Sequence, residues 1–295
     1  MEPEKAIQDN TYEANSKVFA LLSDYLNHKP DFISKEEVEE IVKYGVSPEY
    51  AFSVVFAAAV GLDIADRPAD AELFNNYFNK MLHKLDANEY YNNPYYRNIK
   101  IPAVRIGSSE LKYEHYKPYE AFVCNDIITT EEGRKIPQIG YFAAEFKFPA
   151  VLENNRIWMT VTPNEIETMK EAVARASGNV LTYGLGLGYY AYMISDKAQV
   201  SHITIVESNE DVIGLFRKYI LPQFASPHKI TVVKADAFEY AQEHMSKGNY
   251  DFVFTDLWHD VSDGMDMYLR MKAYEQYHPL TEFMYWIEQS ILCYL

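Results

Sequence analysis

Positive charge, cysteine and long apolar stretches are all scarce in this 295-residue chain. It has 27 Lys and Arg against 43 Asp and Glu, which gives a formal net charge of −16 at pH 7. This balance argues against a nucleic-acid-binding protein, because contact with phosphates needs a basic surface. It would suit a cationic small-molecule acceptor, although acidity more often serves only solubility.

The two cysteines, Cys124 and Cys293, exclude a disulfide framework and fit a reducing cytoplasm. The longest apolar run, residues 51–62, is too short to span a bilayer, so we expect no membrane segment. The first ten residues are polar and acidic and do not resemble a signal peptide. Together these features predict a cytoplasmic protein.

Three regions of the chain differ in pattern. Residues 1–90 predict amphipathic helices, one of them carrying Leu73, Tyr77 and Met81. We interpret this region as a helical cap or as a module through which the chain forms a homo-oligomer. His83 is expected on a helix as a solvated side chain. Residues 91–162 are punctuated by prolines and predict a small β-rich module, with a hairpin whose turn is at residues 153–155.

Residues 163–295 predict an α/β domain. Short apolar strands at 180–183, 202–206, 229–233 and 250–255 alternate with helices, which is typical of a parallel sheet covered on both faces. Residues 282–287 fit either a fifth strand or a helix. Few residues follow Asp256, so we expect the sheet to be shortened at its C-terminal end.

The stretch NVLTYGLGLGYY, residues 179–190, is a predicted strand that runs into Gly184, Gly186 and Gly188 and then into a helix. Glycines allow a sharp turn and a close approach by a ligand, and a helix N-terminus offers free N–H donors. Two tyrosines follow Gly188, so the Lys of a Walker phosphate-binding loop is missing. The glycine spacing, with bulky Leu between, suits a nucleoside whose far end is not a pyrophosphate.

Acidic residues stand at the ends of the next three predicted strands. Glu207 lies about 20 residues beyond Gly188, where an acid can accept hydrogen bonds from both hydroxyls of a ribose. Asp236 follows the third strand and Asp256 ends the fourth. One such acid is usually a helix cap or a turn residue. Three in succession predict a ligand site, because the carboxyl ends of parallel strands share one edge of the sheet.

Taken in order, VLTYGLGLG, ITIVESNEDV, VVKADAFEY and YDFVFTDLWHD resemble the motif set of class I S-adenosylmethionine-dependent methyltransferases, and within them the spermidine-synthase-like branch. The resemblance covers roughly residues 147–265. It implies a Rossmann-like fold that binds S-adenosylmethionine.

The resemblance also implies roles for individual residues. The three glycines would pass under the methionine and ribose parts of the cofactor, and Glu207 would hold the ribose hydroxyls. Asp236, with the backbone of Ala237, would hold the adenine amino group. Asp256 would face the sulfonium and the incoming nucleophile.

The sequence departs from both patterns. Most methyltransferases carry an acid where Thr182 stands, and the spermidine-synthase-like branch has a Ser-Asp-Pro pattern after the acid of strand four, which residues 257–260 lack. The expected activity is therefore methyl transfer to a small-molecule acceptor. Aminopropyl transfer from decarboxylated S-adenosylmethionine is the first alternative. A non-catalytic cofactor-binding or assembly protein is the second.

The loop after Asp256 is rich in functional groups. His259 is a candidate general base, and Asp256, His259 and Asp260 could alternatively hold a metal, although no metal is our expectation. The simplest interpretation of this loop is a helix cap and a turn. On the helix that begins after Thr162, Glu165 and Glu167 could approach the site. More simply, Glu165 completes a capping box and Glu167 is solvated.

Overall fold

The computed structural model describes residues 3–295, with side chains from residue 10 onward. Contacts divide the chain into two compact units, Met1–Ala87 with His115–Lys147, and Asn88–Glu114 with Phe148–Leu295. The β-rich stretch expected at 91–162 therefore contributes strands to both units. The division into regions 1–90, 91–162 and 163–295 stays a prediction. No helix within residues 3–295 combines the length and the apolar character needed to cross a membrane.

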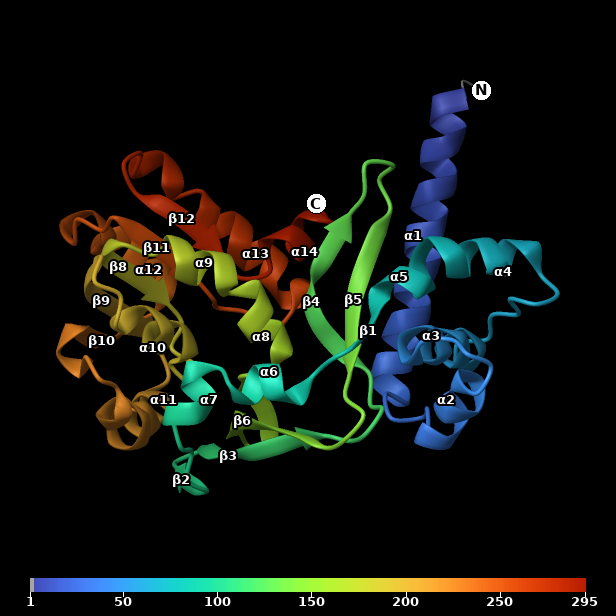
Figure 1. The fold of residues 1–295 in the computed structure, drawn as a ribbon. Coiled ribbons are helices and arrows are strands. Elements are labelled where there is room, and N and C mark those ends of the chain that lie inside the picture. Colours follow the sequence, from blue (N-terminus) through green and yellow to red (C-terminus); the bar gives the residue numbers. More distant parts are fainter. Residues whose placement is uncertain (1–2) are drawn as a thin grey trace. The chain divides into compact units, whose positions relative to one another are not determined.

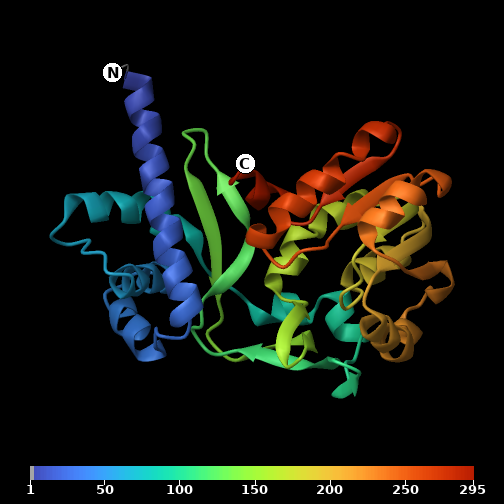
Figure 2. The ribbon, with the colours of Figure 1, turned by 180° about the vertical axis from the view of Figure 1, so that it is seen from behind.

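The first unit begins with five helices: α1 (Pro3–His28), α2 (Lys35–Val42), α3 (Pro48–Ala59), α4 (Pro68–Leu73) and α5 (Asn79–Met81), with a π-helical segment, η1 (Phe74–Phe78), between the last two. Ser34 and Ser47 cap α2 and α3 through their side chains, which satisfies otherwise free backbone N–H groups. The long helix α1 is seen in Figures 1 and 2.

A three-stranded sheet completes this unit: β1 (Leu82–Lys84), β5 (Lys135–Tyr141) and β4 (Phe122–Thr129), in the order β1-β5-β4. The rings of Phe52 and Tyr141 stack in its core, 3.9 Å apart. The expectation of a helical, solvated His83 is wrong. Residue 83 lies on β1, parallel to β5, and its Nε2 lies 2.8 Å from the Gln138 side-chain oxygen, because strand pairing overrides the local helical period here.

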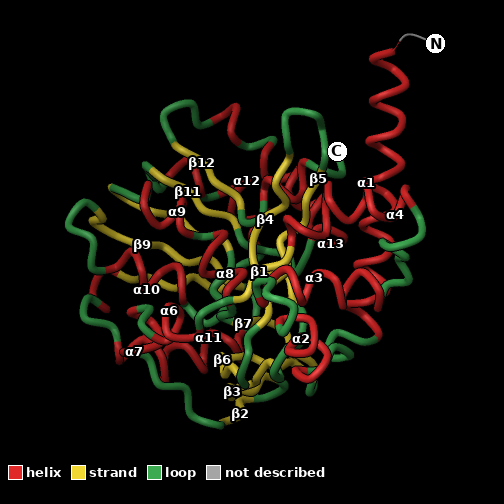
Figure 3. Tube along the Cα trace, turned by 45° about the vertical axis from the view of Figure 1, so that its right-hand side comes forward, coloured by secondary structure: helices red, strands yellow, loops and turns green. Residues whose placement is uncertain are grey.

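The second unit contains the expected α/β sheet. Its five strands are β8 (Gly178–Tyr183), β9 (Val200–Glu207), β10 (Ile230–Lys234), β11 (Phe252–Thr255) and β12 (Glu282–Tyr285), all parallel. Figure 3 shows strands of this sheet in yellow between red helices. The predicted α/β class is therefore confirmed, and residues 282–285 form the fifth strand.

The strand order is β10-β9-β8-β11-β12. Numbered along the chain this is 3-2-1-4-5, which matches the first five strands of the doubly wound order. The winding direction reverses between β8 and β11. In such sheets the crevice at the carboxyl ends of these two strands is the usual ligand site, because the flanking connections leave in opposite directions there.

The remaining helices are α6 (Ala87–Tyr91), α7 (Pro94–Asn98), α8 (Pro163–Thr168), α9 (Lys170–Arg175), α10 (Tyr189–Ser195), α11 (Glu210–Leu215), α12 (Ala237–Glu243), α13 (Val261–Lys272) and α14 (Glu288–Leu292). Short segments of other helical types are η2 (Phe216–Ile220), η3 (Leu221–Gln223), η4 (Pro227–Lys229), η5 (Met245–Lys247) and η6 (Glu275–Tyr277). The helix expected to begin after Thr162 is divided at Met169, the residue between α8 and α9.

A second sheet has the order β2-β3-β6-β7, with β2 (Val104–Ile106), β3 (Ser109–Tyr116), β6 (Phe146–Glu153) and β7 (Arg156–Thr160). β6 and β7 form the predicted hairpin. Asn154 and Asn155 occupy its turn with positive φ angles of 50° and 65°, a conformation that Asn tolerates better than most residues. The edge strand β7 places residues 157–160 on the wall of the cavity described next.

Candidate active site

A cavity of about 280 Å³ lies at the carboxyl ends of β8 and β11, where the winding of the sheet reverses. It is lined by residues 157–161, Glu165, Met169, Thr182, residues 184–187, residues 189–191, Phe254, residues 256–259 and Trp286. Ligand pockets usually measure about 300–1,000 Å³. This cavity could therefore hold a small acceptor or one end of a nucleoside cofactor, but not both in full.

The glycine turn forms one side of the cavity. Gly184, Gly186 and Gly188 all have positive φ angles, 93°, 52° and 70°, which side chains rarely allow. The Gly188 N–H donates to the Leu185 carbonyl at 2.8 Å, and the buried Tyr95 hydroxyl donates to the Leu187 carbonyl at 2.7 Å. These bonds close the turn and fix its backbone.

Packing within the protein explains two of the three glycines. A Cβ on Gly184 would stand 1.9 Å from the carbonyl oxygen of Asp256, and one on Gly188 would stand 2.4 Å from the Phe216 ring. Gly186 is different, because its nearest neighbour would be the Met159 sulfur at 3.2 Å. Gly184 and Gly186 both line the cavity, whereas Gly188 does not.

Glu207 joins the ends of β8 and β9. Only 8% of the residue is exposed. One carboxylate oxygen accepts the Leu185 N–H at 3.2 Å, and the other accepts the Asn209 N–H at 2.7 Å. Each oxygen has a second lone pair, so the carboxylate can still accept hydroxyl groups. Glu207 does not line the cavity.

Asp236 is exposed and caps helix α12. Its Oδ1 accepts the backbone N–H groups of Phe238 at 2.8 Å and Glu239 at 3.0 Å. Ala237 is the first residue of the helix and is buried. The capping role that acids at strand ends usually have is thus present. The adenine contact implied for Asp236 and Ala237 stays a prediction, since neither residue lines the cavity.

Asp256 follows β11 and lines the cavity. Its backbone N–H donates to the Tyr183 carbonyl at 2.9 Å, which holds the residue beside the end of β8. No residue of the described chain donates a hydrogen bond to its carboxyl. Burial, followed by the negative charges of Glu165 and Glu207, raises the pKa of Asp256 to about 8. The carboxyl is thus poised to change protonation near neutral pH.

Glu165 reaches the cavity wall and also serves its own helix. Its carboxylate accepts the Thr160 hydroxyl at 3.0 Å and the Thr162 backbone N–H at 2.8 Å, as the predicted capping box requires. Glu167 is absent from the cavity wall and pairs with Lys170. Of these two glutamates, the structure therefore brings only Glu165 to the site.

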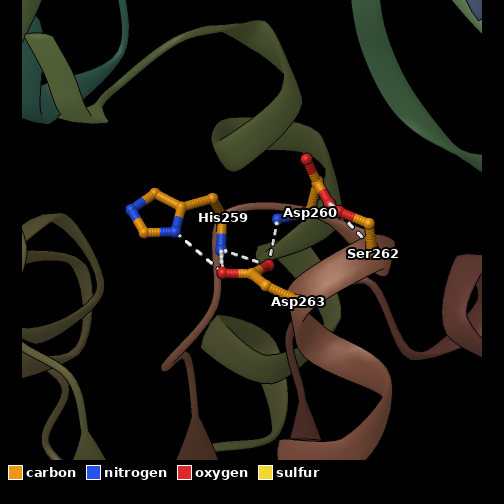
Figure 4. Close-up of polar contacts among 4 residues, drawn as sticks. All are labelled: His259, Asp260, Ser262 and Asp263. Atoms are coloured by element: carbon orange, nitrogen blue, oxygen red, sulfur yellow. Dashed lines mark hydrogen bonds and ion pairs between the residues drawn. The ribbon is translucent and has the colours of Figure 1, made fainter.

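His259 stands in the loop before α13, beside Asp263 (Figure 4). Its Nδ1 lies 2.9 Å from an Asp263 oxygen, and its backbone N–H donates to the same carboxylate at 3.1 Å. The Trp158 ring packs against the imidazole edge-on, with centroids 4.1 Å apart. In residues 3–295 no group contacts Nε2 by a hydrogen bond. The imidazole is therefore oriented on one side and open at its second nitrogen.

Asp263 and Asp260 together cap helix α13. Burial pushes the pKa of Asp263 upward. Hydrogen bonds from the His259 side chain and from the backbone of Asp260 and His259 outweigh it, so the pKa is lowered. Asp260 accepts both the backbone N–H and the hydroxyl of Ser262 at 2.6 Å. The cap and turn expected as the simplest interpretation of this loop are therefore present.

The alternative metal site is not assembled. Among the described residues, no three His, Cys, Asp or Glu side chains lie close enough together to hold a metal ion. Asp260 is directed to its own helix cap and does not line the cavity with Asp256 and His259.

Several cavity residues were not singled out from the sequence. Trp158 and Met159 come from β7, Tyr190 from α10, and Trp286 from the residue after β12. Tryptophan is the rarest amino acid here after cysteine, with three residues in the chain, and this rarity was the one available signal. Rarity does not reveal that distant residues meet, so only the tertiary structure could find them.

No protein-family model matches the sequence. No curated protein matches it either. Solved structures that are similar to parts of the chain include the following two. A SAM-dependent methyltransferase from Agrobacterium tumefaciens is 23% identical, with 38% of this chain and 36% of that chain covered and a TM-score of 0.30. Spermidine synthase from Thermotoga maritima is 18% identical, with 48% and 53% covered and a TM-score of 0.33.

The matched parts span about half or less of those two proteins. Their names agree with the family resemblance expected from the sequence, at the level of a methyltransferase-like fold.

Proposed function

We propose that this chain is an S-adenosylmethionine-dependent transferase that moves a methyl group to a small-molecule acceptor. One observation carries the proposal. The glycine turn, a carboxyl poised to titrate and an oriented imidazole share one cavity at the switch point of a doubly wound sheet. No Lys or Arg belongs to the lining, so no permanent positive charge competes there with a cationic cofactor.

The residues present fit this cofactor in part. Glu207 is buried, retains free lone pairs and is tied to the glycine turn, as a holder of ribose hydroxyls would be. Gly184, Gly186 and Gly188 would carry the backbone beneath the cofactor, while Asp236 and Ala237 would meet the adenine. The cavity would then take the sulfonium end of the cofactor and only the reacting end of the acceptor. S-adenosylmethionine would supply a methyl group activated by its positively charged sulfur.

The residues of the chain would divide the work on the acceptor. Asp256 would orient the nucleophile, because alkyl transfer depends mainly on positioning. His259 would accept at Nε2 the proton that the acceptor loses, since Nδ1 is engaged by Asp263. Asp263 touches no reacting atom in this scheme and acts by holding the imidazole.

Calorimetric titration with S-adenosylmethionine and S-adenosylhomocysteine tests the central proposal. Saturable binding of both is expected. If the folded full-length chain binds neither compound, the proposal is overturned.

Aminopropyl transfer from decarboxylated S-adenosylmethionine is the alternative within the same chemistry, supported by the absence of an acid at Thr182. Product analysis separates the two: S-adenosylhomocysteine indicates methyl transfer and methylthioadenosine indicates aminopropyl transfer. A non-catalytic binding protein would show no product with any acceptor. In that case Asp256→Asn would leave cofactor binding as in the wild type.

The N-terminal helices support a proposal of homo-oligomerisation, and we place the protein in the cytoplasm. Tyr12, Phe32 and Tyr44 are large side chains exposed by 74%, 59% and 82%. Aromatic side chains are enriched at interfaces between protein chains, so these three are the first to test. Light scattering after size-exclusion chromatography checks the oligomeric state, with the triple substitution of these residues by Ser expected to yield a monomer. Cell fractionation checks the location.

A further inference from the structure

All three tryptophans of the chain line the one cavity of the candidate active site: Trp158, Trp258 and Trp286. They come from segments far apart in the sequence. Trp158 is on β7, Trp258 follows β11 and Trp286 follows β12. Tryptophan has the aromatic face that attracts a cation most strongly. Gathering every tryptophan at one small cavity thus indicates a preference for a particular ligand chemistry.

The three rings are held in place by different contacts. Trp286 is 5% exposed and donates its indole N–H to the Thr168 hydroxyl at 2.9 Å. Trp158 is 40% exposed and packs edge-on against His259. Trp258 is 4% exposed, and its indole N–H finds no hydrogen-bond partner among residues 3–295. Burying such a donor without a partner is unfavourable, and an acceptor atom of a bound ligand, such as a hydroxyl oxygen next to its positive centre, would relieve it.

Two carboxyl groups of the cavity have no cationic partner in the described part of the chain. Asp256 and Glu165 both line the cavity, neither forms an ion pair within the described residues, and no Lys or Arg belongs to the lining. The hydroxyl of Tyr190, a lining residue that is 6% exposed, also lacks a partner in residues 3–295. Both acidic residues are half-buried, and partial burial makes a carboxylate without a cationic partner costly. A positively charged ligand would supply the missing partner.

We propose that this cavity is a cage for a compact organic cation, with Trp158, Trp258 and Trp286 as its aromatic walls and Asp256 and Glu165 as its counter-charges. The positive centre is either the sulfonium of the cofactor or an ammonium group of the acceptor, which share this chemistry. Its place in a reaction rests on the proposed function. Cation binding itself does not. An anionic acceptor is disfavoured, because two carboxylates would repel it.

A matched pair of probes tests the charge preference. Choline and 3,3-dimethylbutan-1-ol have nearly the same shape, and only choline is charged. Because every tryptophan lines the cavity, intrinsic tryptophan emission reports occupancy directly. At pH 9 we expect choline to bind at least about tenfold more tightly than the neutral alcohol. Equal affinity for the two probes would overturn the cage.

Substitutions test whether choline binds in this cavity. Asp256→Asn, which preserves shape, and Trp158→Leu, at a partly exposed position, should each weaken choline binding at least about fivefold, with little change for the alcohol. The control is Glu167→Gln, which removes one negative charge from the same helix as Glu165 without touching the cavity. It should bind choline as the wild type does. Choline binding unchanged in both Asp256→Asn and Trp158→Leu would refute the assignment to this cavity.

Two further titrations distinguish the sources of the cation. If the sulfonium occupies the cage, S-adenosylmethionine displaces choline and the uncharged S-adenosylhomocysteine does not. If the acceptor's ammonium group occupies it, choline still binds when either nucleoside is saturating. Either result supports the cage.

The two proposals can fail separately. If choline binds in preference to the alcohol but neither nucleoside binds, the transferase proposal is refuted and the cage proposal stands. If the nucleosides bind and product forms, but choline and the alcohol bind with equal affinity, the cage proposal is refuted and the transferase proposal stands.

Discussion

The carbonyl oxygen of Asp256 lies 1.9 Å from the point where a Cβ on Gly184 would stand. Two strand ends therefore meet at a distance that only glycine permits. This contact sets the spacing between the glycine turn and the carboxyl that faces the cavity. Gly184 thus determines part of the shape of the site in the absence of a ligand.

Gly184→Ala should lower the free energy of unfolding by about 2–5 kcal/mol, since left-handed strain adds to overpacking against backbone that cannot move aside. Gly45→Ala is the matched control. Gly45 has a similar φ of 84°, and no atom lies within 4 Å of the point where its Cβ would stand. It should cost only the strain, about 1–2 kcal/mol. Chemical denaturation measures both, and equal losses would show that the contact with Asp256 does not matter.

Asp256→Asn should stabilise the protein increasingly as pH rises from 4 to 8. The carboxyl pKa is about 8 in the folded chain and near 3.8 when unfolded, so the folded state binds more protons across this interval. Stability then falls with rising pH by roughly 1.4 kcal/mol per unit from this group. Glu165 on α8, Glu207 at the end of β9 and His259 are the other titratable groups at this carboxyl, and they remain in the variant.

Thermal melts of wild type and Asp256→Asn at several pH values check this prediction. The melting temperatures of the two proteins should differ least near pH 4, and the variant should have the higher melting temperature at pH 8. A gap that is constant with pH would mean that Asp256 does not titrate between these limits.

Glu207→Ala should weaken S-adenosylmethionine binding by about 1–3 kcal/mol, the cost of leaving buried hydroxyl partners unpaired. Glu207→Gln keeps the volume and should show the same direction, because an amide nitrogen cannot accept a hydrogen bond. Glu210→Ala is the control, since that side chain is exposed and pairs with Lys234. Calorimetry compares them, and a Glu207 effect no larger than the Glu210 effect would contradict the ribose role.

Asp263→Asn should reverse the tautomer of His259. The carboxylate now favours a proton on Nδ1, whereas an amide N–H would donate to Nδ1 and leave the proton on Nε2. Long-range ¹H–¹⁵N spectra of the imidazole report this directly, and the pH profile of any transfer should lose its basic group. Asp263→Glu would restore the wild-type tautomer where its longer side chain reaches the ring.

Asp260→Asn provides the control for the Asp263 variant. Asp260 caps the same helix and does not contact the imidazole, and Asn caps helices equally well. Its His259 spectrum should match the wild type. Identical spectra for wild type and Asp263→Asn would rule out a positioning role for Asp263.

The strands of the parallel sheet and the turn after β8 could be predicted because their signals are local. Apolar runs marked the strands, and Thr162 marked a helix start together with Glu165, its partner in the capping box. His83 could not be placed in this way, because its strand exists only through pairing with β5. Residues 104–116 gave no strand signal of their own and are ordered by pairing with each other and with β6.

In the candidate site, too, some residues could be predicted from local sequence signals and others could not. Gly184, Gly186, Asp256 and His259 were predicted together and do line one cavity. Glu207 joins them indirectly, through its bond to Leu185, while Asp236 caps a helix outside the cavity. Strand-end position was therefore a sound guide to the edge of the sheet. It does not determine which way each side chain turns there.

By itself the sequence determined the alternation of strands and helices in the parallel-sheet domain, the glycine turn and the acids at successive strand ends, because each depends on neighbours a few residues away. Only the tertiary structure decided that Trp158, Trp258 and Trp286 line the same cavity as Asp256. They come from β7 and from the residues after β11 and β12, and the meeting of rings from distant segments leaves no periodic trace in the chain.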